Sequence, residues 1–162
     1  MIKTKLAFQG EKGAYSHIAC EEIFKDAEIK NCKTFEETFK TVFDDESYKA
    51  IIPIENSLAG RVADIHYLLP KFKLQIYGEH FQKVEHCLLC RNEAELKDIK
   101  YVRSHAQAIG QCQAIIKKNN FKSIISADTA GSAKDLAESS SDTIAAIASE
   151  LAAKTYGLKI LK

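Results

Sequence analysis

The sequence lacks the features that direct a protein to membranes, nucleic acid or the secretory pathway. No apolar run approaches the roughly 20 residues that a membrane-spanning helix needs, and residues 1–5 lead into a short strand pattern instead of a signal peptide. The 23 Lys and Arg residues nearly balance the 22 Asp and Glu, which leaves a formal net charge of +1. Because no strong field would collect nucleic acid or anionic lipid, we expect a soluble, cytoplasmic protein that binds neither.

Disulfide and cofactor motifs are missing as well. The five cysteines are an odd number without framework spacing, which indicates reduced thiols inside a cell. Cys87 and Cys90 have C-x-x-C spacing, but no second pair completes a zinc site, so we interpret them as ordinary buried or edge thiols. Gly10 and Gly13 fit neither a dinucleotide fingerprint nor a P-loop. We therefore expect no nucleotide cofactor, no zinc site and no thioredoxin-type thiol pair.

What the 162 residues do contain is an alternation of short strands and helices. Strands are predicted at residues 5–8, 29–35, 50–53, 101–103, 123–126 and 143–148, and helices at 16–24, 36–43, about 60–69, 106–118, 130–138 and 150–156. Pro70 is expected to end the third helix. This alternation, with 46% hydrophobic residues, predicts an α/β fold with a sizeable core.

Two extended runs, at residues 74–77 and 81–90, interrupt the alternation near the middle of the chain. Gly78 lies between them and marks a crossing into a second lobe. No low-complexity linker or internal repeat separates the halves. We therefore predict two lobes, residues 1–78 and residues 79–162, with the chain end returning toward the first lobe.

Four junctions between a strand and the next helix are rich in small or hydroxylated residues: 9–16, 54–60, 104–107 and 128–132. In open α/β sheets, ligands bind beyond the carboxyl ends of strands, where helix N-termini offer unpaired N–H groups. The same residue types also cap helices, with a contribution of about 1 kcal/mol each, so capping remains the alternative at every single junction. Together the four junctions predict a cleft that binds anions.

The residues at these junctions also resemble the motifs of one family, prephenate dehydratase. The matching segments are FQGEKGAYS at 8–16, PIENSLAG at 53–60, HCLL at 86–89, SHAQ at 104–107 with QC at 111–112, TAGSA at 129–133 and AAIA at 145–148. They occur in the family's order over nearly the whole chain. The resemblance implies a two-lobed α/β domain similar to type II periplasmic binding proteins, with the active site in the interlobe cleft.

The activity implied by the resemblance is the decarboxylative dehydration of prephenate to phenylpyruvate, in a homodimer and without a cofactor. Neutral polar groups suit this chemistry, which has to hold two carboxylates and assist a departing hydroxyl. The resemblance assigns catalytic roles to Asn56, Ser104 and Gln111, and substrate binding to Glu55, Ser57, Gly60, His105, Gln107, Thr129, Ala130 and Gly131. Gln111 follows Ser104 by two helical turns, so both are expected on one face.

Alternative roles remain open for three of these residues. Glu55 is either a general acid whose pKa is raised by burial or a solvated, structural carboxylate. His105 either donates a proton near neutral pH or caps and packs, and Thr129 is expected at a helix N-cap. The remaining histidines, at 17, 66, 80 and 86, are interpreted as structural.

The sequence departs from the family at three points. Ala106 stands where the family usually has Pro, and the 162 residues contain neither a regulatory ACT domain nor a Thr-Arg-Phe triplet. The family places that triplet shortly after the segment matching residues 156–161, and its Thr is regarded as catalytic. A noncatalytic module that binds a small carboxylate, or an inactive remnant, is therefore the alternative to an enzyme.

Loss of one preorganised hydrogen-bond donor typically lowers a rate by about 10² to 10³. The 162-residue chain is therefore expected to form little or no phenylpyruvate from prephenate, which is measured by following the product in time. The comparison is a form extended through a Thr-Arg-Phe motif. Equal turnover by the two forms contradicts the prediction.

Overall fold

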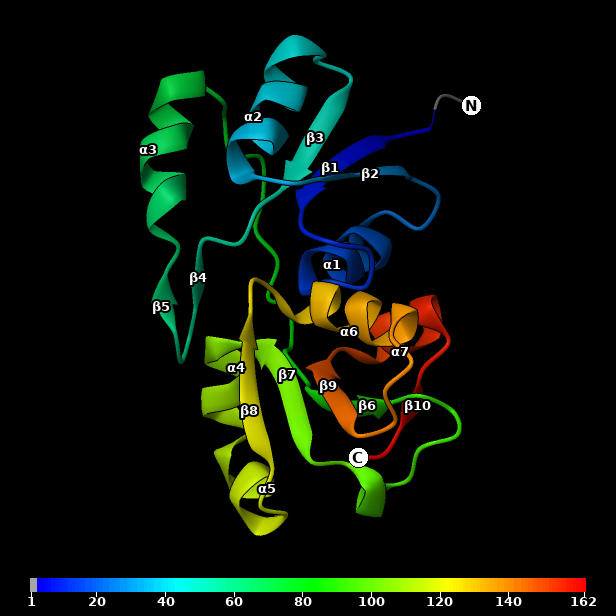
Figure 1. Ribbon diagram of the computed structural model, residues 1–162. Coiled ribbons are helices and arrows are strands. Elements are labelled where there is room, and N and C mark those ends of the chain that lie inside the picture. The colour runs from blue at the N-terminus through cyan, green and yellow to red at the C-terminus, as the bar shows by residue number, and fades with distance from the viewer. Residues whose placement is uncertain (1–2) are drawn as a thin grey trace. The chain divides into compact units, whose positions relative to one another are not determined.

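The computed structural model describes residues 3–162, which divide into two compact units (Figure 1). Unit 1 comprises residues up to 11 and 15–83, and unit 2 comprises residues 12–14 and 84–162. The sequence-based boundary fell after residue 78. Residues 79–83 instead group with unit 1, where His80 Nε2 lies 3.2 Å from a carboxylate oxygen of Glu22.

Unit 1 is built on a three-stranded parallel sheet in the order β2-β1-β3. The central strand β1 (Lys5–Gln9) pairs with β2 (Glu28–Cys32) on one side and with β3 (Tyr48–Ile51) on the other. Three consecutive β1 residues, 6–8, are fully buried. This pattern is typical of a parallel strand that is covered on both faces.

Three helices surround this sheet. Both α1 (Tyr15–Ile23) and α2 (Phe35–Asp44) contact β1, and α3 (Ala63–Phe72) packs on α2. The contact between α2 and α3 centres on the buried side chains Phe39, Ile65 and Leu68. The apolar residues that recur with helical spacing in α2 and α3 therefore form the faces on which these two helices pack.

Local capping and packing shift three boundaries predicted for unit 1. β2 ends at Cys32 because Thr34 is the N-cap of α2 and accepts the Glu37 N–H at 3.1 Å. Pro70 does not end α3, which continues to Phe72 and stops where Lys73 has a φ of 52°. The Phe72 ring packs 5.9 Å from that of Phe39, which holds the last turn in place.

The third predicted helix also begins later than expected. Residues 55–61 form a small hairpin, in which β4 (Glu55–Asn56) pairs with β5 (Gly60–Arg61), and α3 starts only at Ala63. The junction at 54–60 is thus a hairpin turn and not a direct connection from strand to helix.

Unit 2 contains a five-stranded sheet in the order β10-β6-β9-β7-β8. Three strands are parallel: β7 (Tyr101–His105), β8 (Lys122–Ser126) and β9 (Ile144–Ala148). The other two, β6 (Cys87–Cys90) and β10 (Lys159–Ile160), are antiparallel to their neighbours. The described chain ends in this sheet, where the Leu88 N–H donates to the carbonyl of Lys162 at 2.7 Å; a return toward the first lobe stays a prediction.

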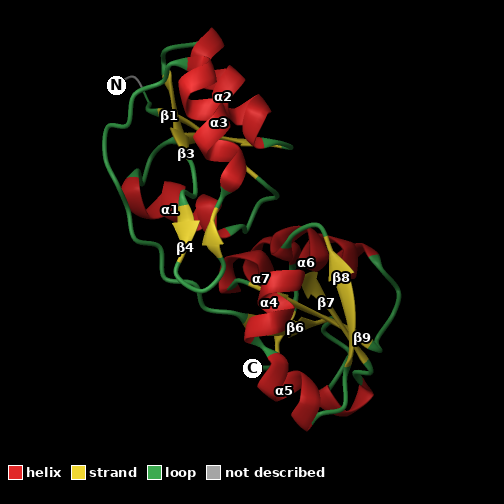
Figure 2. Ribbon diagram, turned by 90° about the vertical axis from the view of Figure 1, so that its left-hand side faces the viewer, coloured by secondary structure: helices red, strands yellow, loops and turns green. Residues whose placement is uncertain are grey.

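Helices cover both faces of the unit-2 sheet (Figure 2). One apolar core lies under α4 (Ala106–Gln111) and α5 (Gln113–Lys118), and a second lies under α6 (Thr129–Glu138) and α7 (Glu150–Tyr156). The single helix predicted at 106–118 is interrupted at Cys112, whose φ of −100° and ψ of 15° are not helical. A short 3-10 turn, Leu96–Asp98, precedes β7.

The extended runs predicted at 74–77 and 81–90 form a strand only at 87–90. Within the described chain, no neighbouring strand pairs with residues 74–86. Tyr77 and Phe81 are 89% and 88% exposed. A strand requires a backbone partner, so the runs predicted to be extended do not form strands at residues 74–86.

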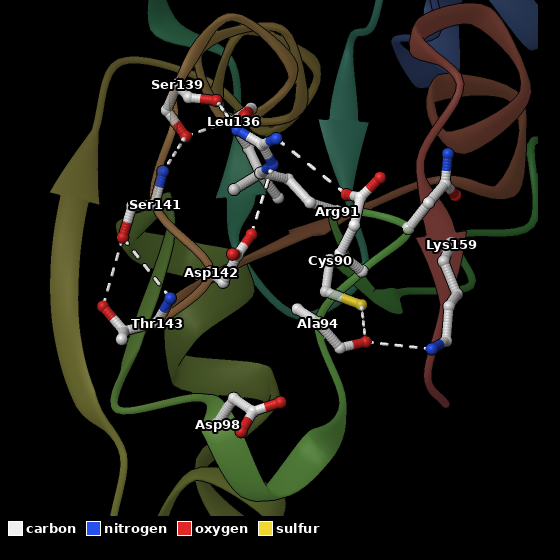
Figure 3. Close-up of polar contacts among 12 residues, drawn as sticks. Cys90, Arg91, Ala94, Asp98, Leu136, Ser139, Ser141, Asp142, Thr143 and Lys159 are labelled. Atoms are coloured by element: carbon white, nitrogen blue, oxygen red, sulfur yellow. Dashed lines mark hydrogen bonds and ion pairs between the residues drawn. The ribbon is translucent and has the colours of Figure 1, made fainter.

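A polar cluster secures the end of the unit-2 sheet at which β9 begins (Figure 3). Arg91 pairs with Asp142 at 3.3 Å and also donates to the carbonyl of Ser139. Nearby, Lys159 Nζ donates to the Ala94 carbonyl at 2.9 Å. The Arg91 contacts fix the loop between α6 and β9, at the end of the sheet opposite the carboxyl ends of its parallel strands, and the Lys159 contact joins β10 to the residues after β6. In the residues that the structure describes, no helix is long and apolar enough to span a bilayer.

Gly13 packs tightly within unit 2. Its φ is +89°, and a Cβ added to it would lie 2.6 Å from the Ala152 Cα. The Ser149 hydroxyl donates to the Gly13 carbonyl at 2.5 Å, which explains why residues 12–14 group with unit 2. Only glycine fits both the backbone conformation and the space.

The Gly13→Ala substitution is expected to lower the free energy of unfolding by roughly 2–4 kcal/mol, from left-handed strain and overpacking together. Denaturant unfolding measures the loss. The matched control is Gly78→Ala, since a Cβ there meets no atom within 4 Å, and it should change stability by less than about 0.5 kcal/mol. Similar losses in the two variants would show that the close contact with Ala152 is unimportant.

Candidate functional site

The carboxyl ends of the three parallel strands of unit 2 share one edge of the sheet. β7 aligns with β8 so that His105 lies opposite Ser126, and β9 runs parallel on the other side. Three helices begin directly beyond these strands: α4, α6 and α7. The edge therefore gathers backbone N–H groups and helix-dipole charge, which is the arrangement that binds anions in α/β proteins.

Each of the three helices at this edge has a side-chain cap. His105 Nδ1 accepts the Gln107 N–H at 3.3 Å, Asp128 Oδ1 accepts the Gly131 N–H at 2.5 Å, and Ser149 Oγ accepts the Ala152 N–H at 3.0 Å. The capping alternative considered for His105 is thus realised. Because Nδ1 accepts, the hydrogen of a neutral His105 ring is on Nε2.

The expectation that Thr129 is an N-cap is wrong, because Asp128 takes that position. Asp128 has the extended backbone of a cap, with φ −154° and ψ 169°, and Thr129 is the first helical residue. Ala130 is fully buried beneath it. A Cβ at Gly131 would lie 2.7 Å from Asp128 Oδ2, so the capping carboxylate occupies the space beside this glycine.

Ser104 lies in the same edge but is fully buried. Its hydroxyl donates to the Ile147 carbonyl on β9 at 2.6 Å. The hydroxyl proton is therefore committed to the backbone, and Ser104 joins β7 to β9 instead of offering a free donor.

Gln111, at the end of α4, lines a pocket of about 360 Å³ in unit 2. His86 Nε2 lies 3.0 Å from Gln111 Oε1, and both residues line this pocket. Burial lowers the pKa of His86, and the hydrogen bond to Gln111 partly opposes that shift. Ile147 of β9 also lines the pocket, and its carbonyl accepts the Ser104 hydroxyl. This residue therefore connects the pocket that Gln111 lines with Ser104.

Two cysteines contribute to the pocket wall. Burial raises the pKa of the Cys87 thiol and of the Cys112 thiol. Both are therefore protonated near neutral pH and are weak nucleophiles. Burial raises the pKa of Cys90 as well, which agrees with the interpretation of the Cys87–Cys90 pair as ordinary thiols.

The predicted residues of unit 1 lie in the β4–β5 hairpin. Asn56 Oδ1 accepts the N–H groups of Leu58 and Ala59 at 2.9 and 3.0 Å, which closes the turn. Gly60 completes the hairpin with a φ of +83°, and Ser57 is exposed. Glu55 is exposed too, which favours the solvated carboxylate over a buried general acid.

The structure thus gathers the predicted residues into two groups. Within unit 2 it brings Ser104, His105 and Gln107 to the same sheet edge as residues 129–131, with Gln111 farther along α4. Within unit 1 it brings Glu55, Asn56, Ser57 and Gly60 together in one hairpin. The interlobe convergence of the two groups stays a prediction.

Sequence reasoning missed two contacts at these positions. His86, which was grouped with the structural histidines, meets Gln111 across a separation of 25 residues. Ser149 meets Gly13 across 136 residues. No local pattern signals either pair, because the partners come together only when the sheet forms.

The chain matches the family model described as Prephenate dehydratase over residues 6–162. It is 43% identical over 157 residues to a bifunctional N-acyl-homoserine lactone acylase/prephenate dehydratase of Komagataeibacter europaeus. The match covers 97% of this chain and 56% of that protein. It is 38% identical over 159 residues to an arogenate dehydratase/prephenate dehydratase of Arabidopsis thaliana, with 42% of that protein and 98% of this chain covered.

A solved structure shares the fold. The prephenate dehydratase from Arthrobacter aurescens, in complex with L-Phe, matches with a TM-score of 0.88 and 28% identity, over 98% of this chain and 54% of that one. The α/β fold expected from the sequence is therefore confirmed. The chain spans roughly half the length of the proteins that it matches.

The cap assignment predicts that Asp128→Ala lowers the free energy of unfolding by about 1 kcal/mol, because the Gly131 N–H loses its acceptor. Asp128→Asn keeps an acceptor oxygen and should recover most of the loss. Thr129→Ala, one residue later, should cost less than roughly 0.5 kcal/mol. Urea unfolding measures the free energy of unfolding of the three variants. A larger loss in Thr129→Ala than in Asp128→Ala contradicts the assignment of Asp128 as the cap.

Proposed function

We propose a function from one premise: this chain belongs to the prephenate dehydratase family. The chain carries the catalytic domain for conversion of prephenate to phenylpyruvate, carbon dioxide and water. The observation that carries the proposal is the family match over residues 6–162. The polar groups at the unit-2 sheet edge and in the unit-1 hairpin support it.

The chemistry sets three demands on the protein. The substrate is a dianion, so its carboxylates need hydrogen-bond donors or positive potential. The departing hydroxyl needs a donor, and water has to be excluded so that the donors act in a low dielectric. Aromatisation of the ring supplies the driving force as its carboxylate leaves as carbon dioxide. No group has to be oxidised or reduced.

Asn56 and Gln111 meet these demands in the same way. The Asn56 oxygen already accepts two backbone N–H groups, and the Gln111 oxygen lies within hydrogen-bonding distance of His86. Each amide is thereby left with its NH₂ group as the part that can meet a ligand. Both side chains are therefore proposed to present donors, which suits an anionic substrate and a departing hydroxyl.

Ser104 and the helix N-termini complete the proposed site. Ser104 holds β7 against β9, and β7 also pairs with β8, so α4 and α6 both start at the same sheet edge. The ten-residue helix α6, capped by Asp128, presents its first turn at residues 129–131. These backbone donors are proposed to bind a substrate carboxylate, together with His105 and Gln107 at the start of α4.

The proposal also covers the oligomeric state, the location in the cell and the choice of substrate. The protein is proposed to act as a cytoplasmic homodimer on a small molecule, without a nucleic-acid or membrane partner. The relative from Arabidopsis thaliana is named for arogenate as well as prephenate, so assays should include both substrates. Prephenate turnover is the expected preference.

A second candidate is the hydrolysis of N-acyl-homoserine lactones, since the relative from Komagataeibacter europaeus is named for both activities. Amide hydrolysis needs an activated nucleophile or water. The buried hydroxyls of Ser104 and Ser149 each donate to a backbone carbonyl, at 2.6 and 2.5 Å, and not to a base. This arrangement favours the dehydratase, and release of the fatty acid from a lactone substrate tests the alternative.

The donor role of Asn56 is tested by Asn56→Asp, which keeps the oxygen that closes the hairpin but replaces the NH₂ group. Turnover of prephenate is expected to fall by about 10² or more, while stability changes by less than roughly 0.5 kcal/mol. Phenylpyruvate is measured in a form extended through a Thr-Arg-Phe motif, because the 162-residue chain is expected to have little activity of its own.

The matched control is Asn120→Asp, which makes the same change of charge in the turn before β8, at the opposite end of the unit-2 sheet. It should leave turnover unchanged. Ser104→Ala is expected to lower turnover and to cost about 1 kcal/mol of stability. Wild-type rates in both Asn56→Asp and Ser104→Ala would remove these residues from the site.

A further inference from the structure

The contact between His86 and Gln111 joins two elements of unit 2 that are remote in sequence. His86 directly precedes β6, and Gln111 is the last residue of α4. Their side chains approach to 3.0 Å between Nε2 and Oε1 at the wall of the pocket. The pocket is otherwise walled mainly by apolar groups, among them Leu88, Ile115 and Ile147.

The chemistry of the two groups fixes which of them donates. An amide oxygen can only accept, so the hydrogen of this bond belongs to His86 Nε2. Burial lowers the pKa of His86, so the ring is neutral near pH 7 and is held in the tautomer with hydrogen on Nε2. The contact is therefore directional.

With the hydrogen on His86 Nε2, the Gln111 amide has one favourable orientation. A flipped amide would lose the bond and place its NH₂ group against the hydrogen on His86 Nε2, which costs about 1 kcal/mol or more. With the oxygen turned to His86, the two N–H donors of Gln111 point away from the imidazole. An amide at the exposed end of a helix thus acquires a single orientation.

We propose that His86 is a positioning residue that orients the Gln111 amide so that its NH₂ donors face the ligand. The identity of that ligand, the dianion prephenate, rests on the proposed function. The orientation of the amide does not, because it is set by residues of this chain alone. The two parts can therefore be tested separately.

The first experiment uses the 162-residue chain without ligand. The Gln111 side-chain NH₂ resonances are assigned by ¹⁵N NMR from their loss in Gln111→Ala, and the ring nitrogens of His86 report the tautomer. His86→Phe should shift or broaden the Gln111 resonances, whereas His86→Gln, which places an amide donor the same number of bonds from Cα as Nε2, should retain them. Unchanged Gln111 resonances in His86→Phe overturn the proposal.

A control separates this effect from the loss of any histidine. His66 is exposed on α3 in unit 1, and His66→Phe should leave the Gln111 resonances in place. The remaining backbone spectrum shows whether each variant is folded. If His86→Phe does not fold, the comparison of His86→Gln with wild type still decides, since displaced Gln111 resonances in a folded His86→Gln variant contradict the proposal.

The second experiment measures prephenate affinity by calorimetry in a double-mutant cycle. His86→Phe should weaken binding roughly three- to tenfold, and the same change in a Gln111→Ala background should have no further effect. Losses that add in the double variant show that His86 acts independently of Gln111 and overturn the positioning role. If wild type does not bind prephenate, the proposed function fails, while the NMR experiment still decides the orientation.

Discussion

The burial of β9 is the constraint on which unit 2 depends. Three alanines of this strand, 145, 146 and 148, are fully buried, and they face helices on both sides of the sheet. Their small side chains let the helices pack closely, and the strand forms the centre of the sheet order. Ile147 on β9 accepts the Ser104 hydroxyl, and Ser149, which follows the strand, caps α7 and binds Gly13. A bulkier side chain in β9 would disturb all of these contacts together.

The polar chemistry of the two units has a common form. In each unit, an amide side chain has its oxygen engaged by groups of its own unit: Asn56 in the hairpin of unit 1, and Gln111 beside His86 in unit 2. The groups left for a ligand are donors, as are the backbone N–H groups of a helix N-terminus. Such donors suit an anion and need no ionised base. They are consistent with the proposed reaction, in which carbon dioxide and hydroxide leave as the ring becomes aromatic.

Much of the fold could be predicted because the relevant signals are local. The alternation of apolar periods correctly indicated an α/β protein, and β1, α2 and β9 lie within a few residues of their predicted positions. The errors occur where pairing or packing between distant residues decides. Residues 81–86 were predicted to be extended like a strand but lack a pairing partner, and Phe72 extends α3 past Pro70 by packing on Phe39. Thr34 ends β2 early because it caps the following helix.

The class of fold, the family and the motifs that contain Asn56, Ser104 and Gln111 could be recognised from the chain alone, because these signals lie in contiguous residues. The contacts of those side chains became known only from the folded structure. It made Asp128 the cap instead of Thr129, committed the Ser104 hydroxyl to Ile147, and placed His86 beside Gln111. These outcomes depend on strand order and on helix ends, which bring together residues far apart in the chain. A periodic pattern can predict each element, but it carries no information about which elements become neighbours.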